Sequence, residues 1–223
     1  MTALATHEVV DDAGRGSSRA VLVPAALALL IVGLVAGLLL GRGMGVAASA
    51  PTNYVDVGFA RDMTTHHAQA VQMSEIVHRR SPDPAVSYLA FDVLSTQQGQ
   101  IGIMTGWLDL WREPQRATEP AMLWMGHVQT GPMPGMATDE EVQSLNTLPL
   151  PQMTERYLRL MIRHHRGAVA MAQFAADKAA TSDVATLADN MDAGQSSEIR
   201  LMQDMLVERG WQPEPDSEPA SDH

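Results

Sequence analysis

An internal duplication constrains the fold of this chain more than any other feature. The segment 63–73 reads M-x-x-H-H-x-x-A-V-x-M, and the segment 161–171 repeats this pattern at an offset of 98 positions. The same offset aligns 97–108 with 195–206, which share the pattern Q-x-x-x-I-x-x-M-x-x-x-L. Because one offset holds across two separated segments, the sequence indicates a single structural unit that is present twice.

Each copy of the unit is predicted to be a helical hairpin. Its apolar residues recur at alternating steps of four and three, which is typical of a helix that faces partner helices. Prolines near 81–84 stop one helix and can start the next, and Thr138 with Glu141 forms a capping-box pattern before a short helix. The chain is therefore predicted to be all-α, with an antiparallel four-helix bundle over residues 54–211. Three of its long helices are expected at about 55–79, 85–112 and 151–181, and the fourth is expected to continue from the end of the third to Gly210.

The composition agrees with a helical core and narrows the chemistry. Aromatic residues make up only 4% of the chain while Met occurs 15 times, which favours helices over a β-sandwich. The formal net charge of -11 argues against a nucleic-acid partner. Since there are no cysteines, disulfides, zinc–thiolate sites and iron–sulfur clusters are excluded, and soft-metal ligands must come from Met and His.

An uncharged apolar run at residues 20–41 predicts a transmembrane anchor. Roughly 20 such residues are needed to cross a bilayer as a helix. Residues 1–19 would then be a short cytoplasmic N-terminus and 42–53 a linker, so a single-pass protein of the cell membrane is expected, with its bulk on the extracytoplasmic side. A cleaved signal peptide is the alternative. The acidic tail 212–223 is predicted to be disordered.

The duplicated histidines fall on the predicted core faces. His66 and His164 occupy seam positions with Met on the same faces, and Gln97 and Gln195 interrupt the facing seams. These four side chains are expected to form a polar rung between Met layers. Burying each without a partner costs about 1–3 kcal/mol, so the rung needs mutual hydrogen bonds, water or a metal.

Imidazole and thioether together are a donor set that suits copper, especially Cu(I), with Cu(II) as the alternative. The adjacent histidines of each pair lie about 100° apart around the helix, so one ring would face the seam and the other a neighbouring groove. The competing interpretation is an inert His/Gln hydrogen-bond network with Met as filler. The predicted metal ligands are Met63, His66, His67, Met73, Met104, Met161, His164, His165, Met171 and Met202.

The loop between the two copies carries a second group of soft donors. These residues would either recruit Cu(I) in a mobile site or simply cover the end of the bundle. Neither His78 nor His223 has a duplicated counterpart, so both are predicted to lie on the surface. The loop donors are Met122, Met125, His127, Met133 and Met136.

These residues resemble the family known as domain of unknown function 305, over about residues 54–211. The family pattern of Met, His-His, Met, then Gln and Glu before Ile-x-x-Met stands complete in the second copy, with Glu198 as its acidic member. In the first copy Gln100 replaces that Glu. The resemblance implies a ferritin-like bundle, and an extracytoplasmic copper buffer or carrier that acts in copper tolerance with a copper-handling partner protein. It implies no enzymatic activity and leaves the oligomeric state open.

Two other classes of function remain open at this stage. A di-iron oxidase needs Glu-x-x-His motifs on two helices plus further carboxylates. Glu75 and His78 form the only such helical motif, and their repeat counterparts are Gln173 and Ala176. A structural bundle that presents its helices to a membrane partner is the other alternative. The sequence has no nucleophile elbow, so a hydrolase is not expected.

Overall fold

The computed structural model describes residues 53–116, 119–126 and 129–216, and all regular structure in these ranges is helical. The described part contains no helix that is both long and apolar enough to cross a membrane. The predicted anchor at 20–41 lies outside the described residues. The elements are α2 (Tyr54–Arg80), α3 (Pro84–Trp111), the 3-10 turn η1 (Leu123–Met125), α4 (Asp139–Thr147), α5 (Leu150–Lys178) and α6 (Ser182–Glu208).

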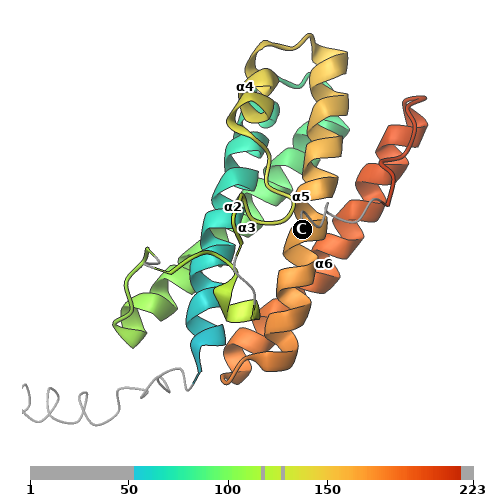
Figure 1. Cartoon of the computed structure of the whole chain (residues 1–223). Coiled ribbons are helices and arrows are strands. Elements are labelled where there is room, and N and C mark those ends of the chain that lie inside the picture. Colours follow the sequence, from blue (N-terminus) through green and yellow to red (C-terminus); the bar gives the residue numbers. More distant parts are fainter. Residues whose placement is uncertain (1–52, 117–118, 127–128, 217–223) are drawn as a thin grey trace, which may run out of the picture. The chain divides into compact units, whose positions relative to one another are not determined.

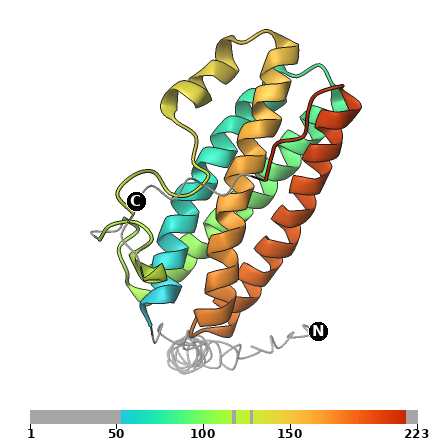
Figure 2. The ribbon, with the colours of Figure 1, turned by 45° about the vertical axis from the view of Figure 1, so that its right-hand side comes forward.

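The four long helices form two antiparallel hairpins, α2–α3 and α5–α6, which meet where α2 packs against α5 (Figures 1 and 2). The chain passes from α3 through η1 and up along the bundle to α4, so α2 and α5 run in opposite directions. The predicted all-α bundle is thus confirmed. The first helices of the two copies, α2 and α5, pack against each other in opposite directions.

Local capping signals set the ends of the first hairpin. The Asn53 side chain accepts hydrogen bonds from the amides of Val55 and Asp56, at 2.9 and 3.3 Å, and so caps α2. Asp83 caps α3, where Pro84 occupies the first turn. Because these signals are local, both predicted helices of this hairpin agree with the structure to within one residue at each end.

The end of α5 shows where local signals were insufficient. The third helix was expected to continue to about residue 181, but it ends at Lys178. The buried carboxylate of Asp56, on α2, accepts hydrogen bonds from the amides of Ala180 and Thr181 and from the Thr181 hydroxyl. A side chain from the other hairpin therefore fixes the turn before α6, and the predicted boundary was wrong for this reason.

The first part of the acidic tail contacts the bundle. Residues 212–216 lie against α5 and α6. Glu214 accepts from Arg159 at 2.8 Å and donates its amide to Gln203, while Arg166 pairs with Asp216. Basic side chains on α5 attract the acidic segment, which composition alone could not show. Residues 217–223 lie outside the described residues.

Two packed clusters make up the core, and both are rich in methionine. The loop-side cluster includes η1 and the buried methionines Met63, Met104, Met122, Met133, Met171 and Met191. The turn-side cluster includes α4 and the buried methionines Met73, Met153, Met161, Met202 and Met205. Each cluster combines methionines of both copies, as expected for antiparallel packing of a duplicated unit.

Candidate metal centre

Four fully buried histidines form a layer at the contact between the two hairpins. We call this set, His66 and His67 on α2 with His164 and His165 on α5, the histidine layer; each is 0% exposed. The rings of His66 and His164 lie 3.8 Å apart between centroids, and those of His164 and His165 lie 6.2 Å apart. His66 and His164 are buried, as expected from their core positions, and so are the outer rings of His67 and His165, which were expected to face a neighbouring groove.

Each ring is held through the same nitrogen, Nε2. That of His66 donates to the backbone carbonyl of Pro134 at 2.9 Å, and that of His164 donates to the carbonyl of His66 at 3.0 Å. The outer pair bonds within its own hairpin: His67 to Gln100 Oε1 at 2.7 Å, and His165 to Glu198 Oε2 at 2.5 Å. All four partners are acceptors, so Nε2 carries the proton and Nδ1 keeps its lone pair.

None of the four Nδ1 atoms has a hydrogen-bond partner among the described residues. A histidine that binds a metal characteristically donates its other ring N–H to a carbonyl or carboxylate, which fixes the tautomer and aims the lone pair. The histidine layer has this arrangement four times. Its chemistry is therefore that of a set of nitrogen donors whose orientation is fixed by these hydrogen bonds.

Burial keeps the imidazoles of His66, His67 and His164 neutral. It lowers the pKa of His66 to about 4 and that of His67 to about 3, and neighbouring imidazoles lower both further. Burial likewise lowers the pKa of His164 well below its usual range. At neutral pH these rings carry no charge, so a metal ion would not have to displace a proton from Nδ1.

The two glutamines of the predicted polar rung are buried, but they do not complete a hydrogen-bond network. Gln97 and Gln195 are 2% and 5% exposed, and neither amide has a partner for its nitrogen or its oxygen in the described region. Each unpartnered buried group costs about 1–3 kcal/mol. The inert His/Gln network proposed as the alternative would have paired these groups with the histidines, and that pairing is absent from the described residues.

The predicted core methionines are all fully buried, in clusters on both sides of the α2–α5 contact. No group of three or more His, Asp or Glu side chains in the described ranges is assembled as a cation site. A metal centre built on the histidine layer would therefore draw its remaining donors from thioethers. The methionines concerned are Met63, Met73, Met104, Met161, Met171 and Met202.

The loop methionines lie closer to the core than the sequence indicated. Met122 and Met133 are buried members of the loop-side cluster, and Met125 and Met136 pack against it half-buried. His127 lies outside the described residues. The loop thus adds thioethers to one methionine cluster rather than forming a separate group.

The Glu-x-x-His motif of the di-iron alternative lies away from this centre. Glu75 and His78 are both exposed; Glu75 pairs with Arg79, and His78 contacts Ser87. The prediction that His78 is a surface residue is confirmed. His223 lies outside the described part of the chain.

Sequence reasoning missed the backbone segment that covers the histidine layer. We call residues 133–137 the strap. Its Pro134 carbonyl accepts from His66, and Gly135 adopts a left-handed conformation with φ of 80° against α5. Every residue has a backbone carbonyl, so the sequence cannot show which carbonyl accepts a hydrogen bond from His66. The Met-Pro-Gly-Met segment was the one available signal, since Pro-Gly favours a tight turn.

The comparisons with known proteins agree with this architecture. The family model for domain of unknown function 305 (DUF305) matches residues 56–206. A DUF305 protein from Streptomyces coelicolor, described as secreted, is 48% identical over 71% of this chain and 96% of its own, with a TM-score of 0.68. A DUF305 fragment from Deinococcus radiodurans is 35% identical over 71% and 99%, with a TM-score of 0.62.

A third structure, CopM in its Cu(II)-bound form, is 28% identical over 69% of this chain and 97% of its own, with a TM-score of 0.58. CopM structures in Cu(I)-bound, silver-bound and apo forms also match, at 25% identity. No curated protein matches the chain. Because the family model spans the whole bundle and the S. coelicolor protein shares nearly half of its aligned residues, this chain belongs to the DUF305 family.

Proposed function

We propose that this protein binds copper outside the cytoplasm, anchored to the membrane through residues 20–41, and acts in copper buffering, transfer or tolerance. One observation carries the proposal. Four buried imidazoles each hold their proton at Nε2 through an acceptor and leave Nδ1 without a partner, beside two clusters of buried methionines. Such a site is costly unless something binds it.

The donor set favours Cu(I) over Cu(II). Neutral imidazole and thioether are soft to intermediate ligands, whereas Cu(II) prefers nitrogen and oxygen in a square-planar or tetragonal arrangement. The proposed nitrogen donors are the Nδ1 atoms of the histidine layer. The proposed sulfur donors are the six core methionines, with the loop methionines as accessory ligands and Gln97, Gln195 and Glu198 as supporting polar groups.

The family relationship supports the same metal and compartment. CopM has been solved with Cu(I), Cu(II) and silver, all soft or intermediate ions. The related S. coelicolor protein is described as secreted, in keeping with an extracytoplasmic position here. A buried site without open coordination suits storage or transfer to a copper-handling partner better than catalysis.

The test is an anaerobic titration of the purified protein with Cu(I) against a chromogenic chelator. The parent is expected to compete, and the His66→Ala/His164→Ala variant is expected to lose most of that competition. His78→Ala removes an exposed histidine from the same helix and serves as the matched control.

Circular dichroism of each variant would confirm that it folds. A parent that cannot compete would contradict the proposal and favour a structural bundle. That alternative predicts instead that replacing the buried histidines with apolar residues of similar size leaves function intact and stabilises the fold.

A further inference from the structure

We propose that soft metal ions reach the histidine layer from one side of the bundle only, through the loop methionines and beneath the strap. This inference rests on the proposed copper binding and adds to it an entry path and a gate. All four histidines are fully buried, so an ion cannot reach them unless some part of the surrounding structure moves.

The strap closes directly over the inner histidines. Its Pro134 carbonyl bonds to His66, and its backbone lies against α5 without side chains between them. A Cβ added at Gly167 would overlap the backbone oxygen of Pro134, and one added at Gly135 would overlap the backbone oxygen of Arg163. With the strap in this position, no ion fits between it and α5.

One side chain on α2 holds the strap in place. The Gln69 amide donates to the carbonyl of Ala137 at 2.9 Å and accepts from its amide at 2.7 Å. With the bond from His66 to Pro134, these contacts tie the strap to α2. A short segment held by a few hydrogen bonds can open locally without unfolding of the bundle. Opening would also break the hydrogen bond from His66 Nε2 to the Pro134 carbonyl, so the same motion would expose the His66 ring and leave it free to move.

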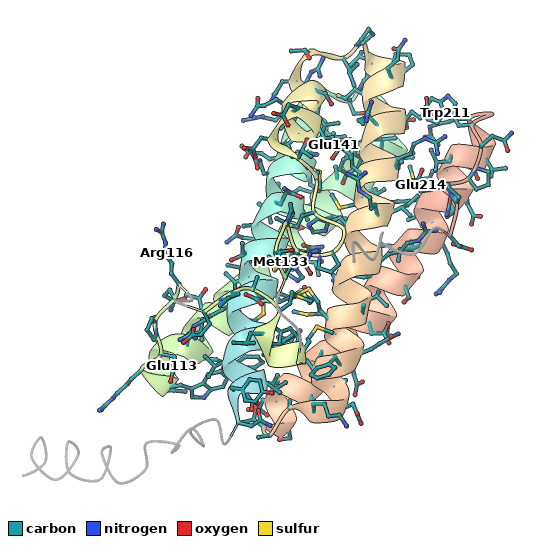
Figure 3. All side chains as sticks on the ribbon, viewed as in Figure 1. Glu113, Arg116, Met133, Glu141, Trp211 and Glu214 are labelled. Atoms are coloured by element: carbon teal, nitrogen blue, oxygen red, sulfur yellow. The ribbon has the colours of Figure 1, made fainter. Side chains whose placement is uncertain are left out.

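The methionines of the loop side form a series from partly exposed to fully buried. Met125 and Met136 are the only methionines in the described ranges that are not buried. Both pack against the loop-side cluster, in which Met122 and Met133 are 1% and 8% exposed and the core methionines are fully buried. Figure 3 places the labelled Met133 beside α2 and α5, where sulfur atoms gather. Successive soft donors of this kind would pass Cu(I) inward.

The loop side is built to hold this series, and the other side is not. Met122 has a φ of 66°, unusual for a side chain other than glycine. The buried carboxylate of Asp62 holds it there by accepting from the Met122 amide at 2.7 Å and from the Trp124 ring nitrogen at 2.8 Å. The repeat counterpart of Asp62 is Leu160, so the second copy has no such anchor. In the turn-side cluster every methionine is buried.

The alternative is that the loop methionines only fill space. Exchange of Met for Leu distinguishes the two ideas, because it removes the sulfur and nearly conserves the volume. The experiment follows anaerobic transfer of Cu(I) from a chromogenic chelate to the whole chain by stopped flow, together with the affinity at equilibrium. Met125→Leu/Met136→Leu is the test variant, and Met153→Leu/Met205→Leu makes the same change in the turn-side cluster.

We expect the loop variant to take up Cu(I) at least about fivefold more slowly, and this slowing to exceed any loss of equilibrium affinity, since the loop thioethers act mainly while the ion is in transit. The turn-side variant should match the parent. Gln69→Ala should speed uptake and release together by about tenfold, because two hydrogen bonds no longer hold the strap. Gln72→Ala, at an exposed position on the same helix, is its control.

Unchanged uptake in the loop variant would overturn the entry path, and unchanged rates in Gln69→Ala would overturn the gate. Equal slowing in the loop and turn-side variants would also overturn one-sided entry. These results differ from failure of the proposed function, in which the parent itself would take no Cu(I) from the chelate. Thermal melts of all variants, including the single variant Met136→Leu, would show whether a changed rate of Cu(I) uptake comes from loss of folding.

Discussion

The two copies of the hairpin differ in what holds their outer histidines. In the first copy His67 donates to the neutral amide of Gln100; in the second, His165 donates to the carboxylate of Glu198. The two pairs occupy the same repeat positions, and both Nδ1 atoms lack partners among the described residues. The duplicated histidines are thus the proposed donors, and their hydrogen-bond partners Gln100 and Glu198 differ between the copies.

A carboxylate partner makes an imidazole a stronger donor than an amide does, because it stabilises the ring as electron density moves to the metal. The second copy is therefore expected to bind copper more tightly than the first. The first copy has instead acquired the strap and loop contacts through His66, Gln69 and Asp62. On the proposed function, the second copy would contribute more to the copper affinity and the first would control access to the site.

The largest expected effect is the loss of stability in acid, to which both copies contribute. The folded-state pKa values of His66, His67 and His164 lie below the unfolded value of about 6.5, so the unfolded chain binds more protons as pH falls. Their stability contribution is complete above pH 6.5 and is lost as pH falls toward about 4 and 3. Each ring contributes a slope of about 1.4 kcal/mol per pH unit.

Urea unfolding of the metal-free protein at pH 7, 6 and 5 measures this loss. Replacing His67 with Leu should flatten the profile, while His78→Ala should leave it unchanged. A free energy of unfolding that stays constant between pH 7 and 5 would contradict the burial of neutral imidazoles in both copies.

The second effect exchanges the feature that distinguishes the copies. Glu198→Gln makes the second copy resemble the first and should weaken the tighter Cu(I) affinity by about tenfold or more, as is usual for the loss of a partner to a metal ligand. Gln100→Glu should strengthen the weaker site. Competition titrations of both variants measure the change, with Glu155→Gln on α5 as a control. If neither Glu198→Gln nor Gln100→Glu changes the Cu(I) affinity, the carboxylate does not cause a difference in affinity between the copies.

A third effect, on stability rather than on affinity, concerns the strap, which contacts different residues in each copy. Gly167→Ala should cost about 1–3 kcal/mol of unfolding free energy, because the new methyl group overlaps the Pro134 carbonyl. Gly194→Ala, on the exposed face of α6, should instead stabilise the protein by up to about 1 kcal/mol. Thermal unfolding of the two variants compares them directly. A stabilised Gly167→Ala protein would show that the strap does not lie against α5 in solution.

The parts of the fold that sequence could predict are those with local causes. The helix ends around Ser81 and Asp83 were predicted because prolines and capping side chains act on their own neighbours. The end of α5 was missed because Asp56, far away in sequence, binds the turn before α6. The contacts of residues 212–216 were missed for a similar reason, since their partners lie on α5 and α6.

The candidate site likewise has features that the sequence could predict and features that it could not. Periodicity placed His66 and His164 in the core with methionines on both sides, because a helical face follows directly from spacing. It could not show which ring nitrogen is protonated, since the partners include the backbone carbonyl of Pro134 and that of His66 itself. The outer histidines were expected to face a neighbouring groove, and they instead bond to the second helix of their own hairpin.

The most direct test of the central claim is a long-range 15N–1H NMR spectrum of the histidine side chains, recorded without oxygen before and after addition of Cu(I). We predict that the metal-free protein shows four buried rings protonated at Nε2, and that Cu(I) shifts the Nδ1 resonances of the histidine layer while His78 remains unchanged. Rings protonated at Nδ1 before metal is added, or Nδ1 resonances that do not respond to Cu(I), would contradict the account.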